Sequence, residues 1–181
     1  MSGQDNSESL RYALHETGRV VQSWDTGIKA GMQHDASACA TFWLKEGVHY
    51  LVDMVVVRLE YPALKRRIVS HAARFLPEVV LIEDKGSGQS LLQDLRLEQA
   101  LPVIGVQPVG DKVARVTRIT PLLEAGKMAL PEFAPWLAAF EAEFFAFPDA
   151  PHDDQVDDAV SQYFNWVRNS AKQVAPGVRR I

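Results

Sequence analysis

The chain has 181 residues, of which 47% are hydrophobic and 23% charged, with a formal net charge of −4 and a single cysteine. This length accommodates one domain with a sizeable core. The negative charge excludes a global basic field for nucleic acid, so such binding needs a local patch or metal ions, and the lone cysteine excludes an internal disulfide or a cysteine-rich zinc site. No stretch of the sequence resembles a membrane span or a signal peptide.

The first third of the sequence predicts a flexible segment followed by three antiparallel strands. Residues 1–17 are polar and form the predicted flexible segment. Strands are predicted over 19–24, 37–44 and 49–57, because these stretches are apolar and rich in aromatic and β-branched residues. Residues 45–48 join the last two as a hairpin loop, so the three strands form a meander.

The remaining sequence alternates predicted helices with short apolar strands. The strands over 78–83 and 103–106 are nearly all apolar, as expected for strands buried on both faces of a sheet. Helices are predicted from apolar spacing, prolines at their starts and glycine stops over 62–76, 89–99, 112–125 and 131–145, and a last helix opens in the acidic stretch 150–159.

This order of elements predicts an α/β fold. Three antiparallel strands followed by alternating helices and parallel strands make a mixed five-stranded sheet with helices on its faces. This is the strand order of the ribonuclease H-like fold, although other α/β folds also begin with a meander. The predicted domain spans 18–170, and residues 171–181 are predicted to be a C-terminal tail.

The stretch from His152 to Asp158 holds four carboxylates and a histidine within seven residues. Asp153 or Asp154 can cap the following helix, and Asp154 and Asp157 share a helical face, where two neighbouring carboxylates favour a divalent metal ion. Alternatively, these acids only complement the helix dipole. His152 is a metal ligand, a proton relay or a structural cap, and the structural role is slightly favoured.

Two further acids are expected at the same edge of the sheet. Asp25 ends the first strand and Glu83 the fourth, so they project together if these strands are parallel neighbours. With the last-helix acids they would supply hard oxygen ligands for two Mg²⁺ or Mn²⁺ ions. Asp25 is alternatively a turn residue. Asp84 is expected to point away from Glu83, because neighbours on a strand alternate faces.

The best local basic group consists of Lys85, Lys112, Arg115 and Arg118. Lys112 and Arg115 are three residues apart, on one helical face, where they can meet phosphates beside the metals. A solvated helix face is the alternative. The glycines at 86 and 88 lack the Gly-Lys-Ser/Thr ending of a phosphate loop, and they are expected to let a DNA backbone or a neighbouring strand approach closely.

Six short motifs, in order, resemble one known family, the C-terminal nuclease domain of tailed-phage terminase large subunits. They are SWDT at 23–26, HDAS at 34–37, YLVD at 50–53, LIEDKGSG at 81–88, DKVAR at 111–115 and HDDQVD at 152–157. The resemblance runs from about Val20 to Trp166. It implies a ribonuclease H-like fold and two-metal cleavage of concatemeric viral DNA during packaging.

The resemblance also implies a ligand set. Asp25 matches the first-strand aspartate, Glu83 the fourth-strand acid and Asp157 the last-helix acid, with Asp154 three residues before it. The Asp-x-x-Asp helix is similar to that of Holliday-junction resolvases, which share the fold. The secondary candidates are Asp84, Asp153, His152 and Asp158.

The implied partners are double-stranded DNA, a terminase ATPase domain, the small terminase subunit and the portal protein, in the cytoplasm of the bacterial host. The sequence departs from complete large subunits, because it has no Gly-x-x-x-x-Gly-Lys-Ser/Thr motif and no room for an ATPase. It is therefore interpreted as an excised domain or a prophage remnant. A structure-selective resolvase and a degenerate domain that only binds DNA or packaging proteins are the alternatives.

Overall fold

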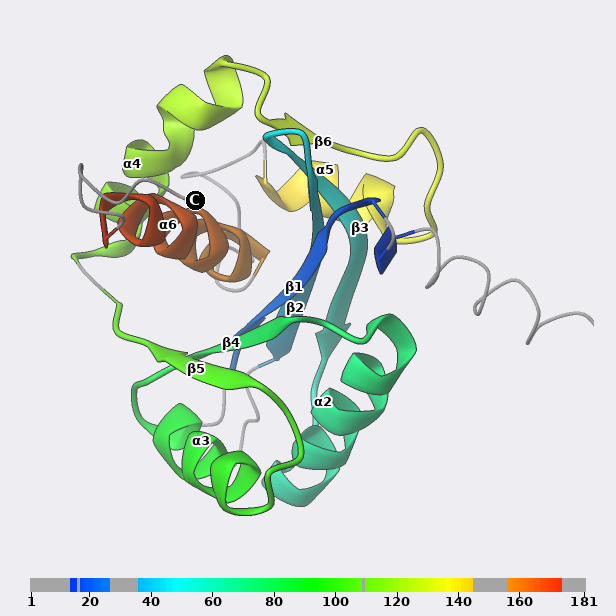
Figure 1. Ribbon diagram of the computed structural model, residues 1–181, viewed down its shortest axis with the longest axis vertical. Helices are drawn as coiled ribbons and strands as arrows, with labels where there is room; N and C mark the ends of the chain where they lie inside the picture. The colour runs from blue at the N-terminus through cyan, green and yellow to red at the C-terminus, as the bar shows by residue number, and fades with distance from the viewer. Residues whose placement is uncertain (1–13, 16, 27–35, 109, 145–155, 174–181) are drawn as a thin grey trace, which may run out of the picture.

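A six-stranded mixed sheet forms the centre of the molecule (Figure 1). The computed structural model describes residues 14–15, 17–26, 36–108, 110–144 and 156–173. The strand order across the sheet is β5-β4-β1-β2-β3-β6. The strands are β1 (Arg19–Asp25), β2 (Ser37–Lys45), β3 (Val48–Val57), β4 (Val79–Glu83), β5 (Val103–Val106) and β6 (Met128–Ala129).

The pairing of the strands confirms the predicted fold class. β1, β2 and β3 form an antiparallel meander, and β4 pairs parallel to β1 on its other side. β5 continues the sheet parallel to β4. Glu46 and Gly47 connect β2 to β3 with positive φ angles of 52° and 78°, which suit a tight two-residue hairpin turn.

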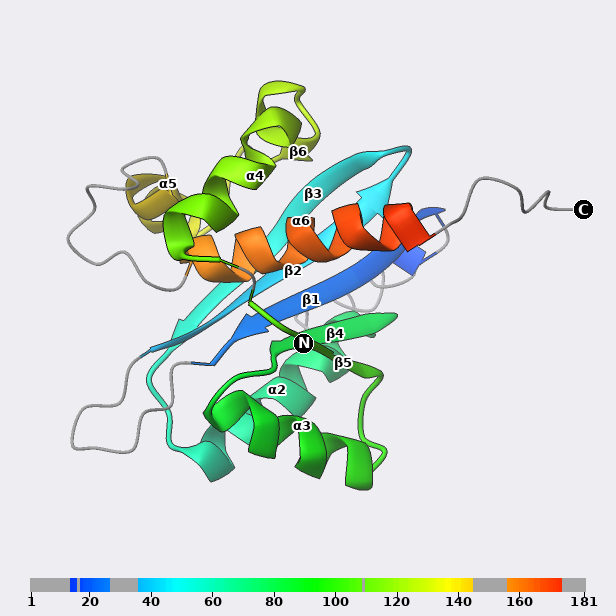
Figure 2. The same cartoon turned by 90° about the vertical axis from the view of Figure 1, so that its left-hand side faces the viewer.

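Helices cover both faces of this sheet (Figure 2). On one face lie α2 (Tyr61–Phe75) and α3 (Ser87–Leu97), and on the other α4 (Lys112–Glu124), α5 (Leu137–Phe144) and α6 (Val156–Gln173). α6 runs across the sheet and contacts β1, β2 and β4. No helix among the described residues is long and apolar enough to cross a membrane.

The two faces have separate cores because side chains alternate along each strand. Val21 and Leu81 belong to the cluster under α4, α5 and α6. Trp24 and Ile82 belong to the cluster under α2 and α3. The next residue on each strand, Asp25 or Glu83, therefore faces α6.

Aromatic contacts fix α6 on its face of the sheet. The ring of Tyr163 stacks on that of Phe42, with centroids 3.9 Å apart. The Tyr163 hydroxyl also lies 2.7 Å from Nδ1 of His49 on β3. Phe164 packs edge-on against Phe42 as well. These buried contacts set which face of α6 is turned toward the ends of β1 and β4.

Two elements differ from the sequence prediction. The helix predicted over 131–145 begins only at Leu137, because Pro131 and Pro135 disfavour helical geometry in the residues before them. The two-residue strand β6 adds a sixth strand beside β3. Gly126, with φ of 64°, turns the chain back after α4, and His49 N donates to Lys127 O at 2.8 Å, where the pairing begins.

Of the predicted flexible segment 1–17, the structure describes Leu14, His15 and Thr17. Leu14 is buried against Val20 and Phe75. Its carbonyl oxygen accepts a hydrogen bond from Trp43 Nε1 at 2.9 Å. Part of this segment therefore packs on the sheet at the end opposite Asp25 and Glu83.

Candidate active site

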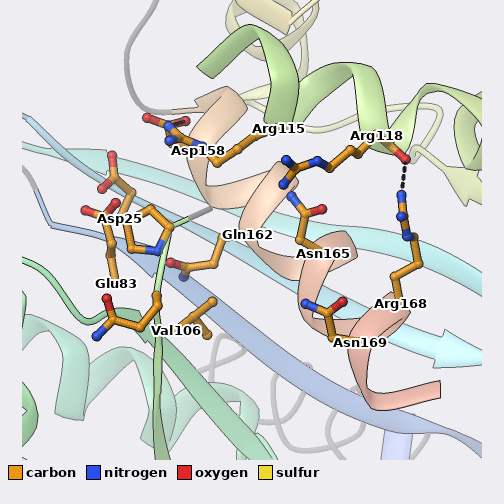
Figure 3. Close-up of a pocket in the computed structure, with 12 residues that line it drawn as sticks. Asp25, Glu83, Val106, Arg115, Arg118, Asp158, Gln162, Asn165, Arg168 and Asn169 are labelled. Carbon is orange, nitrogen blue, oxygen red and sulfur yellow. Dashed lines mark hydrogen bonds and ion pairs between the residues drawn. The ribbon is translucent and has the colours of Figure 1, made fainter. Parts of the chain in front are cut away.

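Asp25 and Glu83 stand at the carboxyl ends of neighbouring parallel strands. The register pairs Ser23 with Leu81 and Trp24 with Ile82, so Asp25 and Glu83 are the next residues along β1 and β4. Figure 3 shows both side chains pointing into one pocket. In open α/β sheets ligands bind in this kind of crevice, outside the carboxyl ends of the strands.

The pocket has a volume of about 350 Å³ and lies between the strand ends, α4 and α6. The strand ends contribute both carboxylates, and the segment after β5 forms a second wall. Helices α4 and α6 close the pocket with charged and amide side chains. The lining residues are Asp25, Glu83, Val106, Gln107, Pro108, Arg115, Arg118, Asp158, Gln162, Asn165, Arg168 and Asn169.

An ion pair between α4 and α6 lies at the acidic end of this pocket. Arg115 Nη2 donates to Asp158 Oδ1 at 2.5 Å, and Arg115 Nη1 donates to Gly110 O at 3.2 Å. The guanidinium and the carboxylate are mostly buried, with exposed side-chain fractions of 17% and 23%. Arg115 thus offsets part of the negative charge that Asp25, Glu83 and Asp158 bring together (Figure 3).

The electrostatic surroundings of Glu83 disfavour its charged form. Burial raises the pKa of Glu83 above its usual value, and the nearby Asp158 carboxylate raises it further. Arg115 and Lys85 act on this pKa in the opposite direction. A cation bound beside Glu83 would favour the carboxylate in the same way.

The carboxylates that the structure describes in the pocket could supply part of a metal site. Asp25 and Glu83 supply carboxylate oxygens, the ligand type that Mg²⁺ and Mn²⁺ prefer. Within the described residues, no group of three His, Cys, Asp or Glu side chains is arranged to hold a metal ion, and Asp158 is engaged by Arg115. The remaining ligands predicted from the sequence are Asp154, which precedes α6, and Asp157.

The residues predicted as ligands around the start of the last helix are only partly described. His152, Asp153 and Asp154 lie outside the described residues. Asp157 lies in the first turn of α6, but its side chain is not described. Asp158, a secondary candidate from the sequence, lines the pocket with Asp25 and Glu83, and among the described side chains of α6 it is the one carboxylate that does so.

Asp84 lies on the opposite face of the sheet from Glu83. Its backbone N–H donates to Val106 O at 2.9 Å, which extends the pairing of β4 with β5. Its side chain is held over Gly105, where an added Cβ would be 3.2 Å from Asp84 Cβ and 3.0 Å from Leu92 Cδ1 of α3. Strand alternation thus separates Asp84 from the pocket.

Two of the four predicted basic residues line the pocket. Arg115 and Arg118 project from α4, whose N-terminus is capped by the Asp111 carboxylate accepting from Ala114 N at 2.8 Å. Lys85 is exposed just after β4. Lys112 begins α4, but its side chain is not among those described.

Gly88 brings the start of α3 against the end of β4. A Cβ at this position would collide with the carbonyl oxygen of Glu83 and lie 3.2 Å from Thr26 Oγ1. The glycine therefore permits the close approach that the sequence predicts, and the approaching group is the chain's own strand. Any side chain at position 88 would have to move the backbone that carries Glu83.

Gln162 is a site residue that the sequence reasoning missed. Its Nε2 donates to Ser23 Oγ at 3.0 Å and to Trp24 O at 3.2 Å. These buried bonds tie α6 to β1 immediately before Asp25. The available signal was its spacing of four residues from Asp158, which places both on one helical face.

Solved structures of viral nucleases have the same fold. The large terminase nuclease from thermophilic phage G20c, solved with bound zinc, is 16% identical, with a TM-score of 0.58 over 80% of this chain and 81% of that chain. The nuclease domain of the g2p large terminase from bacteriophage SPP1, with bound Mn, is 17% identical, with a TM-score of 0.59 over 86% and 90%.

A resolvase shares the fold as well. Fowlpox virus resolvase, in complex with Holliday junction DNA, is 13% identical, with a TM-score of 0.52 over 84% of this chain and 99% of that chain. At identities this low the three likenesses establish a common fold, which confirms the ribonuclease H-like class predicted from the sequence.

Comparison with protein families and with curated proteins gives the affiliation of the chain. No curated protein matches it. The family model described as the terminase RNaseH-like domain matches residues 22–165, an interval that begins within β1 and ends within α6. Because this interval covers most of the sequence, the chain belongs to the terminase RNaseH-like domain family.

Proposed function

We propose that this domain is the metal-dependent DNA endonuclease of a phage DNA-packaging terminase large subunit and cuts concatemeric viral DNA. The observation that carries the proposal is the pair of carboxylates, Asp25 and Glu83, that two adjacent parallel strands direct into one pocket beneath α6. Like charges in a half-buried site disfavour each other. A fold retains them there when a cation is part of the function.

The proposed ligands of two Mg²⁺ or Mn²⁺ ions are Asp25, Glu83, Asp154 and Asp157. Bound ions of this kind lower the pKa of a water molecule and stabilise the charge that develops on phosphate oxygens during hydrolysis. The G20c nuclease was solved with zinc or magnesium and the SPP1 nuclease domain with Mn. These relatives support a divalent ion in the proposed site.

The chain's own residues have supporting roles around the carboxylates. Gln162 holds α6 against β1, which fixes the distance between the strand acids and the helix acids. Arg115 and Arg118, together with Lys85 and Lys112, are the proposed contacts to phosphates beside the cleaved bond. Arg115 would exchange its present partner, Asp158, for a phosphate oxygen.

The identity of the α6 ligand is a separate question with its own test. Asp154 and Asp157 are proposed, and Asp158 is the competing acid because it already lies in the pocket. Single Asp→Asn substitutions at these three positions should show which of them bind metal. Each substitution that abolishes both cleavage and Mn²⁺ binding marks a ligand, whereas loss of cleavage alone marks a residue that contacts DNA or Arg115.

The proposed partners follow from the family. Double-stranded DNA is the substrate, delivered by a terminase ATPase domain working with the small subunit and the portal protein in the cytoplasm of the bacterial host. The net charge of −4 predicts weak DNA binding in isolation, as suits a nuclease that receives its substrate from a partner.

Cleavage of supercoiled plasmid tests the proposed activity. The purified chain is incubated with Mn²⁺, Mg²⁺ or EDTA beside a Glu83→Gln variant, which removes the charge and keeps the shape. Cleavage should require the metal and fall roughly 10²–10³-fold in the variant, as for loss of one preorganised electrostatic contact. Glu124→Gln, an exposed substitution at the end of α4, is the matched control and should cut like wild type.

Two outcomes would contradict the proposal. Equal cutting by wild type and Glu83→Gln would trace the activity to a contaminant. Absence of cutting, together with no Mn²⁺ binding by calorimetry, would leave a domain that only binds DNA or packaging proteins.

A structure-selective resolvase is the second candidate function, favoured by the likeness to the fowlpox resolvase. It predicts faster cutting of four-way junctions than of linear duplex, by a dimer in solution. The terminase proposal predicts no preference for junctions. Matched junction and duplex substrates, with the oligomeric state measured by light scattering, distinguish the two.

A further inference from the structure

The pocket continues beyond its carboxylates along α6. Its α6 wall includes Asp158, Gln162, Asn165 and Asn169, which follow one another at intervals of four, three and four residues. This spacing places them on one face of the helix. α6 therefore presents a continuous polar stripe that leads away from Asp25.

The charge of the lining side chains changes sign along the pocket. All three carboxylates lie at one end, whereas Arg168 lies toward the other (Figure 3). The guanidinium of Arg118 reaches back along α4 to Gly110, so it does not belong to that other end. At that other end, the lining contributed by described residues contains no carboxylate. We call this part of the pocket the distal group, which consists of Asn165, Arg168 and Asn169.

Arg168 is held in position across the gap between the two helices. Its Nη1 donates to the carbonyl oxygen of Arg118 at 2.9 Å. A guanidinium has five N–H donors in a planar fork that matches phosphate geometry, and this bond uses one of them. The contact therefore fixes the side chain while leaving it able to bind an anion.

We infer that the distal group binds the backbone of the DNA strand that is cut at the carboxylates, an inference that rests on the proposed nuclease function. An α-helix rises about 1.5 Å per residue, so the ten residues from Asp158 to Arg168 span about 15 Å. One strand of B-DNA carries a phosphate about every 3.4 Å along the axis. With α6 parallel to the DNA axis, Arg168 reaches a phosphate roughly four nucleotides from the cleaved bond.

The chain's overall charge makes such a local site necessary. A net charge of −4 repels DNA as a whole, and the carboxylates beside the cleaved bond add to this repulsion. Arginine and asparagine side chains bind phosphates whatever the neighbouring base. The distal group therefore holds the strand in register without selecting its sequence.

Binding of a fluorescein-labelled 30-base-pair duplex in EDTA tests the inference without cleavage. Arg168→Gln should raise Kd about tenfold at 100 mM KCl and reduce the slope of log Kd against log [KCl] by about 0.9, the effect of losing one phosphate contact. Arg168→Lys should restore most of the slope, because the charge is kept. Asn169→Asp, at an exposed position, should weaken binding by repulsion without affecting folding.

Arg66→Gln is the matched control, since it removes an exposed arginine from α2 on the other face of the sheet. It should bind DNA with the Kd and salt slope of wild type. The inference is overturned if Arg168→Gln and Asn169→Asp also match wild type, or if wild type shows no binding at 50 mM KCl.

Plasmid cleavage separates this inference from the proposed function. Distal-group variants should need more DNA for half-maximal rate but keep a maximal rate within about threefold of wild type, whereas Glu83→Gln loses the maximal rate. If wild type cuts and the distal-group variants need no more DNA than wild type for half-maximal rate, the inference fails and the nuclease proposal stands. Binding that depends on Arg168 without any metal-dependent cutting removes the nuclease and leaves a DNA-binding groove.

Discussion

The two ends of the β1–β4 strand pair carry opposite charge arrangements. At the amino ends Arg19 and Glu78 form a two-pronged ion pair, with Nε to Oε2 at 2.7 Å and Nη2 to Oε1 at 3.0 Å. At the carboxyl ends Asp25 and Glu83 place two acids in one pocket. Between these ends the two strands pair in one parallel register from Val21–Val79 to Trp24–Ile82, and the ends differ in their side chains and in their exposure to solvent.

The contrast separates a structural use of charge from a functional one. The Arg19–Glu78 pair lowers the pKa of Glu78, because the guanidinium favours the carboxylate. The pKa of Glu83 is raised by burial and by Asp158, so its charged form lowers the stability of the free domain. An arrangement that lowers stability persists where it serves binding or catalysis.

Asp25→Asn should have the largest effect on cleavage, because it removes one of the two acids at the carboxyl ends of β1 and β4. Metal-dependent cleavage should fall at least about a hundredfold, equivalent to roughly 3 kcal/mol of transition-state stabilisation. In the companion variant Glu83→Gln, the free energy of unfolding should stay constant or increase, since a buried charge is lost. Urea titration measures this, and a clear loss of stability in Glu83→Gln would show that the ionised carboxylate has a structural role.

Gly88→Ala should disturb the carboxyl end through the backbone. Its Cβ would collide with the Glu83 carbonyl oxygen, so α3 or the end of β4 must shift. We expect a stability loss of about 1–3 kcal/mol and a drop in cleavage of about a hundredfold, as a displacement of about 1 Å can cause. Gly47→Ala is the control: its φ of 78° costs about 1 kcal/mol, but nothing lies within 4 Å and cleavage should be unchanged.

Gln162→Leu should act on the same end through α6. It removes two hydrogen bonds and leaves Ser23 Oγ and Trp24 O without this donor, at a cost of about 1–3 kcal/mol. Cleavage should fall about tenfold, because α6 is less firmly tied to β1. In a double-mutant cycle with Ser23→Ala the two losses should be less than additive. Strict additivity would mean that the bond to Ser23 contributes nothing.

The mixed fold could be read from the sequence because its signals are local. Apolar strands, helical spacing and turn residues each depend on a few neighbouring positions, and alternation then predicts that Asp25 and Glu83 share an edge and a face. The late start of α5 and the two-residue β6 were missed because prolines overrode an apolar pattern and a strand this short has no periodicity.

The polar partners in the pocket were less predictable. Gln162, Asn165 and Arg168 acquire their roles only when α6 lies across β1 beside α4. Which acid faces the pocket depends on the rotation of α6, and that rotation is fixed by the contacts of Tyr163 with Phe42. The sequence placed a pair of acids there but could not orient the helix.

Asp53 on β3, a carboxylate outside the pocket and enclosed under α2, gives a pH-dependent comparison. His71 Nε2 lies 3.7 Å from Asp53 Oδ2 and 3.3 Å from Thr41 Oγ1. Burial, with Arg67 and Arg74 nearby, lowers the pKa of His71 from 6.5 to about 4. Protonation therefore favours the unfolded chain, and the free energy of unfolding should fall by about 2 kcal/mol from pH 7 to pH 5.

Burial raises the pKa of Asp53, so protonation of Asp53 favours the folded chain and opposes the effect of His71 as the pH falls. Comparison with His71→Gln, which keeps Asp53, isolates the contribution of His71. The difference in stability between wild type and His71→Gln should change by this amount over the same pH range, in urea titrations at several pH values. A constant difference would show that His71 titrates normally in the folded chain.

Glu78→Gln should have the smallest effect, although it breaks the best-formed ion pair at the amino ends. Both side chains are about half exposed, at 52% and 53%, so solvent and salt screen the pair. The loss in free energy of unfolding should be at most about 1 kcal/mol and should shrink further in 1 M NaCl. Because the pair lowers the pKa of Glu78, its stabilisation is present above the normal carboxyl pKa of 4.5 and disappears as the pH falls through the lowered value. Cleavage should not change. A loss of cleavage in Glu78→Gln would mean that the two ends of β1 and β4 are coupled, and the contrast between a structural end and a functional end would then fail.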